Sequence, residues 1–380
     1  MSNESKINAE SRGGLEIRHL YKVFGPNPHG AISKLKSGAT RDQILAENGQ
    51  VVAVDNVSFS VGAGEMFVVM GLSGSGKSTL IRCINRLIEP SAGQILIDGE
   101  DLAAADAQSL RQARLHKVAM VFQHFALFPH RTVIENVEYG LKIRGMPKVV
   151  RRRKAYETLE LVGLTDWAER LPDALSGGMR RRVGLARALA VEPQVLLMDE
   201  PFGALDPLIR GELQHELVQI QKRLKTAIIF ITHDINEALL LGKRIAVMRN
   251  GRFIQVGSGD DIVRRPTDDY VAAFGRDVDR LRCFTAASVM RPTTLLSADP
   301  AEVGHFSGQT VPANTRLVSL LAHCRSGKPV AVVDEAGKLC GIVNYADILG
   351  ALDPTPGVEA ASPGGEPSSP HNLHHLTRGK

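Results

Sequence analysis

Residues 71–79, GLSGSGKST, combine the residue types that hold a nucleotide phosphate. The stretch follows a strand-like apolar run and opens a helical pattern, which is the context that a P-loop requires. In such a loop glycines let backbone N–H groups point at the phosphates, the lysine adds positive charge, and the serine hydroxyl can bind Mg²⁺. The spacing fits this motif at Gly71, Gly76, Lys77 and Ser78.

A second set of reactive side chains follows the apolar run VLLM at residues 195–198. Asp199 and Glu200 emerge at the carboxyl end of this predicted strand, where open α/β sheets bind ligands. Asp199 suits Mg²⁺, which prefers carboxylate oxygens together with phosphate. Glu200 can point elsewhere, at an attacking water. With a P-loop in the same chain, the pair predicts phosphoryl transfer rather than a solvated strand end.

The stretch ALSGGMRRRVGLARAL at 174–189 is a second candidate anion cradle. Ser176, Gly177 and Gly178 stand just ahead of a helical run, where backbone N–H groups and the helix dipole favour an anion. The arginines that follow lie in a helical pattern, for which a solvated face is the default interpretation.

Composition narrows the class of protein. The 380 residues are 43% hydrophobic and 23% charged, which is typical of a globular chain of two domains with tails. The apolar runs are strand-length, and the N-terminus lacks the apolar core of a signal peptide. Four scattered cysteines indicate a reducing compartment. Despite a net charge of +5, aromatic residues make up 5% and do not interleave with basic ones, so nucleic-acid binding is not expected.

Alternating strand and helix patterns predict an α/β fold with a parallel sheet buried on both faces. Residues 25–50 are polar, contain Gly and Pro, and read as an insertion with one short helix around 41–47. Residues 131–173 have a helical pattern. Residues 311–352 read as helix, strand, turn, strand and helix, with an opening strand expected at 288–296, and the Pro-, Gly- and Ser-rich tail at 353–380 is predicted to be disordered.

Six motifs in this order resemble those of the ATP-binding subunit of ABC transporters. They are GLSGSGKST (Walker A), Gln123 (the Q-loop glutamine), LSGGM at 175–179 (the signature), VLLMDE at 195–200 (Walker B with the catalytic glutamate), ALD at 204–206 (the D-loop) and His233 (the switch histidine). The resemblance covers about residues 15–275. It implies a P-loop NTPase (RecA-like) core with an antiparallel β subdomain and a helical subdomain at about 124–190.

The resemblance also implies the site residues. Glu200, His233 and Lys77 would be catalytic, and Mg²⁺ would be bound by Ser78, Gln123 and Asp199. Phe24 would stack on adenine, with Tyr21 as the competing candidate because the insertion blurs the match. The remaining residues would bind ATP: Gly71, Ser73, Gly74, Gly76, Lys77, Ser78, Thr79 and Gln123 around the phosphates of one chain, and Ser176, Gly177 and Gly178 facing the γ-phosphate on a partner chain.

The insertion, the phrase INRLIEPSAGQILIDG, Met179 and the run FGRDVDRL at 274–281 look like importers of quaternary amines, with the glycine betaine/proline group as the closest match. Residues 283–352 resemble a cystathionine-β-synthase (CBS) type regulatory region whose first copy is degenerate. The usual Ser/Thr-x-x-Asp of such modules is replaced by Asn344-x-x-Asp347, which leaves nucleotide binding, ionic-strength sensing and dimer bracing open.

The expected function is an ATPase that powers uptake of quaternary amines such as glycine betaine, proline betaine or choline. Its expected partners are a second copy of the chain in a head-to-tail dimer, transmembrane permease subunits and an external substrate-binding protein. The expected location is peripheral, on the cytoplasmic face of the inner membrane. A soluble ABC ATPase acting on ribosomes or DNA is the main alternative, and a non-hydrolytic regulatory module is a third.

Overall fold

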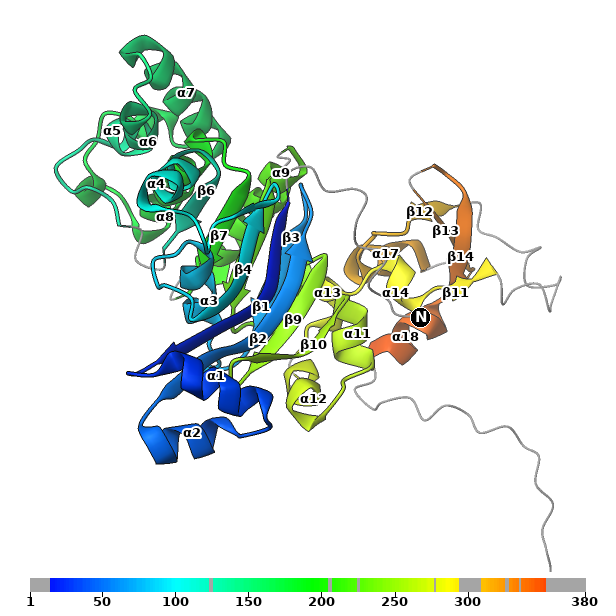
Figure 1. Cartoon of the computed structure of the whole chain (residues 1–380). Coiled ribbons are helices and arrows are strands. Elements are labelled where there is room, and N and C mark those ends of the chain that lie inside the picture. The colour runs from blue at the N-terminus through cyan, green and yellow to red at the C-terminus, as the bar shows by residue number, and fades with distance from the viewer. Residues whose placement is uncertain are drawn as a thin grey trace, which may run out of the picture.

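A computed structural model describes residues 14–122, 126–203, 207–223, 226–276, 278–293, 309–324, 328–334 and 336–352. Gln123, the ALD motif at 204–206 and the tail from residue 353 lie outside the described residues. Figure 1 shows two sheets packed together, an arm of helices at one end, and a smaller C-terminal unit at the side.

The central sheet has the strand order β10-β9-β3-β8-β7-β6. The strands from β6 to β9 run parallel, as the sequence predicts, whereas β10 pairs with β9 antiparallel through a tight turn. Every residue of β3, β7 and β8 is buried, because helices or a second sheet cover both faces. The strands are β3 (Met66–Met70), β6 (Val118–Val121), β7 (Val195–Asp199), β8 (Ala227–Thr232), β9 (Arg244–Arg249) and β10 (Arg252–Gly257).

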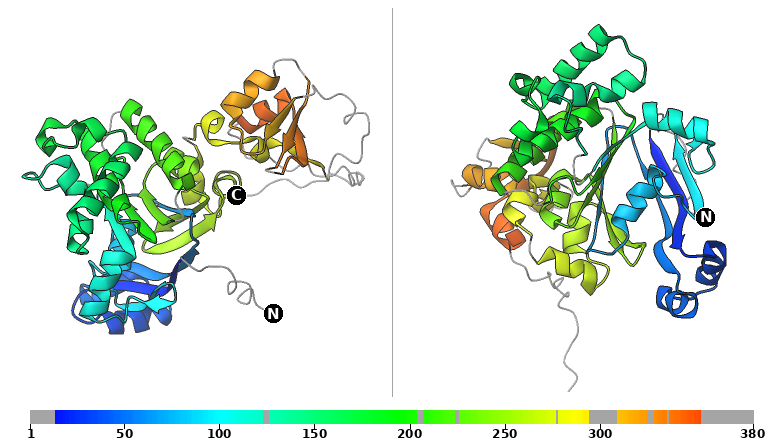
Figure 2. Two further views of the ribbon diagram at one scale, coloured as in Figure 1. Left: turned by 90° about the horizontal axis from the view of Figure 1, so that it is seen from above. Right: turned by 90° about the vertical axis from the view of Figure 1, so that its left-hand side faces the viewer.

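A second, antiparallel sheet has the order β2-β1-β4-β5, which confirms the expected antiparallel subdomain. Helix α3 (Lys77–Ile84) lies between the two sheets (Figure 2), where its residues Leu80, Ile81 and Ile84 are buried. The stacked rings of Phe59 and Phe67, with centroids 4.8 Å apart, join the sheets directly. The strands are β1 (Leu15–Phe24), β2 (Val51–Val61), β4 (Ala92–Ile97) and β5 (Glu100–Asp101).

The insertion at 25–50 folds into two helices, α1 (Pro28–Lys36) and α2 (Arg41–Asn48). The sequence predicted only the second one, which begins at a capping box formed by Thr40 and Gln43. Both helices bury apolar residues against β1 and β2, and this small cluster consists of Tyr21, Val23, Ala31, Ile32, Leu35, Ile44 and Val52.

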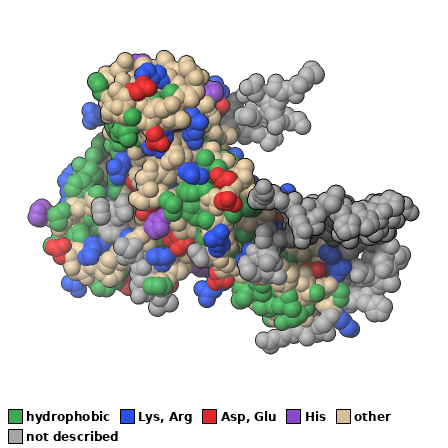
Figure 3. All heavy atoms as spheres, turned by 90° about the horizontal axis from the view of Figure 1, so that it is seen from below, with side chains coloured by type: hydrophobic (Ala, Val, Ile, Leu, Met, Phe, Trp, Pro, Cys, Tyr) green, Lys and Arg blue, Asp and Glu red, His purple; other side chains and the backbone are tan. Residues whose placement is uncertain are grey.

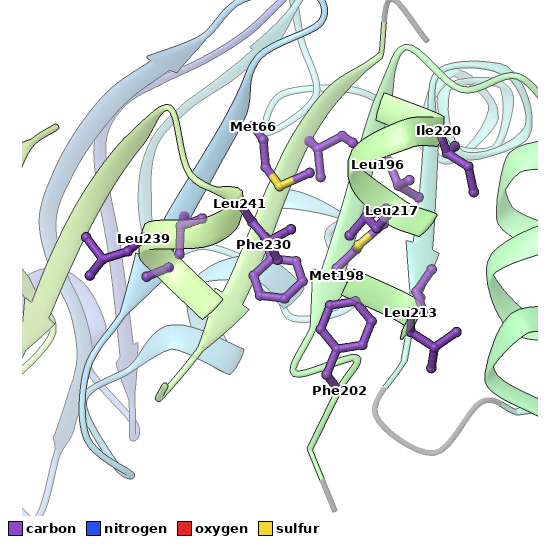
Figure 4. Packing of buried hydrophobic residues seen from close by; sticks show 14 of the residues in the cluster. Met66, Leu196, Met198, Phe202, Leu213, Leu217, Ile220, Phe230, Leu239 and Leu241 are labelled. Atoms are coloured by element: carbon purple, nitrogen blue, oxygen red, sulfur yellow. The ribbon is translucent and has the colours of Figure 1, made fainter. Parts of the chain in front are cut away.

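The helical arm packs on the central sheet through a large apolar cluster. Figure 4 shows the part of this cluster that β3, β7 and β8 form with helices α9 and α10. Phe202 and Phe230 pack there with ring centroids 5.5 Å apart, directly below the end of β7. The segment at 131–173 is helical, as predicted, and α4 was not expected. The arm and flanking helices are α4 (Ala107–His116), α5 (Val133–Val137), α6 (Tyr139–Ile143), α7 (Lys148–Leu161), the 3₁₀ turns η2 (Thr165–Trp167) and η3 (Pro172–Ala174), α8 (Gly177–Ala190), α9 (Pro207–Arg223) and α10 (Ile235–Leu241).

The C-terminal unit contains a sheet of order β11-β14-β13-β12 covered by short helices. The predicted helix, strand, turn, strand and helix are confirmed, but the opening strand expected at 288–296 is wrong in its first part. Residues 286–289 form a helix that begins at a Thr285–Ser288 capping box. Residues 294–308 lie outside the described residues. Three helices lead from the central sheet to this unit: α11 (Gly259–Arg264), α12 (Asp269–Gly275) and α13 (Arg280–Cys283). The elements of the unit are α14 (Ala286–Val289), β11 (Arg291–Pro292), β12 (Thr310–Pro312), α17 (Leu317–His323), β13 (Val330–Val333), β14 (Leu339–Val343) and α18 (Tyr345–Leu352).

The Asn344-x-x-Asp347 segment caps the last helix. Asn344 N–H donates to the Asp347 carboxylate, and Asp347 N–H donates to the Asn344 side-chain oxygen, both at 2.8 Å. Arg291 lies 3.4 Å from the same carboxylate. Asp347 is therefore already engaged by groups of its own unit.

Within the described residues, no helix combines the length and hydrophobicity needed to cross a membrane. On the face of the molecule shown in Figure 3, basic and acidic side chains are interspersed.

Candidate functional site

The P-loop joins β3 to α3 as the sequence predicts. At Gly71, where φ is +154°, a Cβ atom would lie 2.2 Å from the carbonyl oxygen of Met248. At Gly76, where φ is +107°, a Cβ atom would lie 2.3 Å from the carbonyl oxygen of Ala53. Both glycines are thus required by the conformation of the loop and by the backbone packed against it. No side chain caps α3, so its first N–H groups remain available for an anion.

Lys77 fills the mouth of this loop. Its side-chain Nζ donates to the carbonyl oxygens of Gly71 at 2.8 Å and Leu72 at 3.0 Å. The residue is only 4% exposed. Burial lowers the pKa of the ammonium group, while the nearby carboxylates of Glu200 and Asp199 act in the opposite direction. The two carbonyl oxygens carry only partial negative charge. A bound phosphate would give the Lys77 ammonium group a fully charged partner.

Ser78 and Asp199 come together from different elements. The Ser78 hydroxyl donates to Asp199 Oδ1 at 2.8 Å, and Arg82 Nη2 lies 3.5 Å from Asp199 Oδ2. Asp199 is the last residue of β7 and is 1% exposed. A hydroxyl and a buried carboxylate in contact, beside a phosphate cradle, are the oxygen donors that Mg²⁺ takes in proteins. The residues therefore fit the ion that the sequence implies.

Glu200 and His233 face each other across neighbouring strands. Asp199 is paired with Ile231 in the parallel register of β7 and β8, so the residues that follow both strands emerge side by side. His233 Nδ1 lies 3.3 Å from Glu200 Oε2. Glu200 has a φ of +45°, which is rare for a residue with a side chain and is found at functional sites. This brings together two of the three residues that the resemblance implied as catalytic, the third being Lys77 in the P-loop.

The signature segment begins α8 as predicted. Ser176 is the N-cap, and its hydroxyl oxygen accepts a hydrogen bond from the Met179 N–H at 3.2 Å. Ser176 and Gly177 are exposed, and a Cβ atom at Gly177 would meet no atom within 4 Å. Among the described residues, no hydrogen bond or ion pair joins either residue to the P-loop of the same chain.

The two candidates for adenine stacking differ in exposure. Tyr21 is 5% exposed, because the insertion helices cover it. Phe24, at the end of β1, is 41% exposed, and Lys22 Nζ lies 4.7 Å from its ring centroid. Phe24 is therefore the more exposed of the two candidate rings. Ser73 is exposed in the loop and Thr79 is half-buried in α3, while Gln123 lies outside the described residues.

Tyr270 contacts the site although the sequence analysis did not select it. Its hydroxyl accepts from the Leu72 N–H and donates to the Met248 carbonyl oxygen, both at 3.3 Å. Phe274 packs edge-on against the ring at 5.3 Å between centroids. Helix α12 therefore holds the first turn of the P-loop. No local pattern reveals this contact, since the two residues lie 198 positions apart.

Comparisons with known proteins agree with this geometry. The family model described as ABC transporter matches residues 54–203. A glycine betaine/proline betaine transport system ATP-binding protein of Salmonella typhimurium is 44% identical over 91% of this chain and 84% of its own. A glycine betaine/carnitine transport ATP-binding protein of Listeria monocytogenes is 50% identical, over 73% of this chain and 70% of its own. A solved ATP-binding cassette dimer bound to ADP and phosphate is 31% identical, with a TM-score of 0.54 over 64% of this chain and 98% of that chain.

Proposed function

The chain belongs to the ABC transporter family as an ATP-binding subunit, an ATPase coupled to transport, and we propose that it powers the import of a quaternary amine. The observation that carries the catalytic part of this proposal is the contact of Glu200 with His233 beside the P-loop. Relatives that act on glycine betaine, proline betaine and carnitine support the substrate class. The relatives give no support to the alternative of an ATPase on ribosomes or DNA.

The proposed roles follow from position and charge. Lys77 leaves the loop carbonyls and pairs with the β- and γ-phosphates, whose other oxygens are bound by loop N–H groups. Ser78 and Asp199 hold Mg²⁺, together with Gln123 as the resemblance implies. The ion, when bound, neutralises phosphate charge. Phe24 stacks on adenine. The backbone N–H groups of Gly71, Ser73, Gly74, Gly76 and Thr79 complete the phosphate cradle.

Hydrolysis depends on Glu200 as general base for the attacking water, with His233 in contact with the γ-phosphate and Glu200. Ser176, Gly177 and Gly178 have no bond to their own P-loop among the described residues. We assign them to the γ-phosphate held by a second copy, in a head-to-tail homodimer with two composite sites. The solved cassette dimer with ADP and phosphate supports this arrangement.

The helical arm is the proposed docking surface for the permease. Several large apolar side chains on it are exposed, including Val149 at 83%. Such side chains commonly mark a protein interface. In this arrangement the subunit is peripheral, on the cytoplasmic face of the inner membrane, and an external binding protein delivers the amine to the permease. The other exposed apolar residues of the arm are Ile143, Tyr156, Leu161, Trp167 and Leu171.

We further propose that residues 15–275 form the ATP-binding domain, with its helical subdomain at about 124–190, and that residues 283–352 form a CBS-like regulatory region. The sheet β11-β14-β13-β12 with its covering helices supports a separate C-terminal unit. Because the Asp347 carboxylate accepts from the Asn344 N–H at the start of α18 and pairs with Arg291, we assign this region to regulation or dimer bracing rather than to ribose binding.

Glu200→Gln tests the catalytic assignment. The variant keeps ATP binding but loses its general base, so hydrolysis falls by about 100-fold or more and a closed dimer accumulates. Lys77→Ala is the matched variant that loses nucleotide binding instead. Turnover measured by phosphate release and dimer formation measured by light scattering distinguish the two, and wild-type hydrolysis in Glu200→Gln contradicts the assignment.

Isolation of the chain with its partners tests the transport assignment. Co-purification with a membrane permease, followed by uptake of labelled glycine betaine, proline betaine, carnitine and choline, identifies the amine. Co-purification with ribosomes instead would contradict transport while leaving the ATPase assignment intact.

A further inference from the structure

Glu237 is a buried carboxylate next to the site that the proposed chemistry does not use. It lies in the first turn of α10 and is 5% exposed. Its Oε2 accepts from the Thr232 hydroxyl at 2.5 Å, and its Oε1 accepts from Gln214 Nε2 at 3.2 Å. A carboxylate withdrawn from water is costly unless such bonds compensate it. Burial is also the main cause that raises the pKa of Glu237.

The obvious structural role, capping α10, belongs to another residue. Asp234 is the N-cap, and its Oδ1 accepts from the N–H groups of Asn236 at 2.8 Å and Glu237 at 3.4 Å. The side chain of Glu237 instead turns back to Thr232, the last residue of β8. Glu237 therefore holds the carboxyl end of β8 and does not cap α10.

The Thr232 hydroxyl links the residues on both sides of His233. It donates to Glu237 and accepts from the Asp234 N–H at 3.0 Å. The His233 side chain is 59% exposed, so packing of its ring contributes little to its orientation. The backbone before and after the histidine is fixed by one hydroxyl, and that hydroxyl is fixed by Glu237.

Arg210 extends this network to α9. Its Nη1 lies 3.3 Å from Asp234 Oδ2 and its Nε lies 3.9 Å from Glu237 Oε1. Helix α9 follows the ALD motif at 204–206. Arg210 therefore connects this helix to Asp234 and Glu237, the two acidic residues that follow His233. Arg210, Thr232 and Glu237 also line one small cavity together with Glu200 and His233.

We propose that Thr232 and Glu237 are positioning residues that hold His233 against Glu200, and that Arg210 ties this arrangement to helix α9. The inference rests on the proposed function, because it assigns a purpose to the contact between His233 and Glu200. It predicts that turnover depends on the Thr232 hydroxyl, although Thr232 is only 1% exposed and its hydroxyl is bonded to Glu237.

The test compares two buried threonines at opposite ends of the same strand. Thr226 stands just before β8 and is 6% exposed, and its hydroxyl donates to the Pro193 carbonyl oxygen at 2.9 Å. Thr232→Val and Thr226→Val each remove one buried hydroxyl, which leaves the Glu237 carboxylate and the Asp234 N–H without that partner in the first variant and the Pro193 carbonyl in the second, so the melting temperature of each variant is measured beside its kcat. Only Thr232→Val removes the link to His233.

For the full-length chain we expect kcat of Thr232→Val to fall about tenfold or more while KM for ATP stays within about twofold, since the P-loop is untouched. Thr232→Ser keeps the hydroxyl and restores kcat to within about twofold of wild type. Thr226→Val keeps wild-type kcat even if its melting temperature falls. Equal kcat losses in the two valine variants, or no rescue by serine, would overturn the inference.

Glu237→Gln gives an independent measurement if Thr232→Val does not fold. Its amide oxygen can still accept from Thr232, but it loses the charge that faces Arg210, so kcat falls below the wild-type value while KM for ATP is unchanged. Wild-type kcat in Glu237→Gln and Thr232→Val, with a strong loss in His233→Ala and Glu200→Gln, rejects the inference alone. Wild-type turnover in His233→Ala and Glu200→Gln rejects the proposed function itself.

Discussion

The two anion cradles of this chain differ in what surrounds them. The P-loop is packed at both ends against its own chain, with the Met248 and Ala53 carbonyls against Gly71 and Gly76 and with Lys77 bonded to the Gly71 carbonyl, while its middle residues are exposed. The signature segment stands open, with nothing within 4 Å of a Cβ atom at Gly177. The ends of the first cradle are thus formed within one chain, whereas the exposed second cradle agrees with the proposed site shared between two chains.

The largest effect that this contrast predicts is at Gly76. Gly76→Ala places a Cβ atom against the Ala53 carbonyl oxygen and forces a strained φ, so the loop must shift. ATP affinity, measured by calorimetry, should fall by at least about tenfold, because strain of this kind costs about 1–3 kcal/mol. Unchanged affinity would show that the enclosing wall is not needed.

Gly177→Ala should separate binding from turnover. The new methyl group meets no atom of its own chain, and alanine suits the first turn of a helix. Thermal stability and ATP binding by the isolated subunit therefore stay at wild-type level. Hydrolysis by the dimer should fall by about tenfold or more if the methyl group meets the nucleotide on the partner. Full turnover in this variant would contradict the shared site.

Ser176 tests the contrast further, because its side chain caps α8 and also lies in the exposed signature segment. Ser176→Ala removes the cap of α8 and should lower the free energy of unfolding by about 1 kcal/mol, whereas Ser176→Gly should cost only a few tenths. Denaturant titration measures both. If the hydroxyl also contacts the partner's nucleotide, the two variants lose similar turnover despite their different stability. If turnover instead falls only in the less stable variant, Ser176 acts only as the cap of α8.

The smallest effect concerns Cys83 on α3, behind the P-loop. Burial raises the pKa of its thiol to about 12, and the residue is fully buried, so it should not react with a thiol reagent in the native protein at pH 8. Cys340 is half-exposed and should react first. Cys340→Ser is the control that removes this fast phase. Rapid labelling of Cys83 without nucleotide would show that the P-loop region opens before ATP binds.

The motifs that the sequence predicted depend on local rules. Apolar runs set β3, β7 and β8, and the reactive residues follow at their carboxyl ends because parallel strands finish at one edge of the sheet. Helix α1 was missed because its polar composition hides the few apolar residues that it buries under β1. The strand expected at 288–296 failed in part because local capping by Thr285 and Ser288 overrides a short apolar pattern.

Contacts between distant segments could not be predicted from the sequence. Glu237 reads as an ordinary residue of a helix start, and only the packing of α10 on β8 and α9 makes it the partner of Thr232. The difference in exposure between Phe24 and Tyr21 likewise depends on the insertion helices, which pack against Tyr21.

The contact between Tyr270 and the P-loop has a consequence for protein engineering. The shortest chain that keeps the loop in its described conformation must extend through α12, well past residue 203 where the family model stops. Asp279 N–H also donates to the Asn236 side-chain oxygen at 2.9 Å, in the first turn of α10, close in sequence to His233. A chimera that exchanges the C-terminal unit should therefore be joined after residue 283, so that both contacts travel with the ATPase.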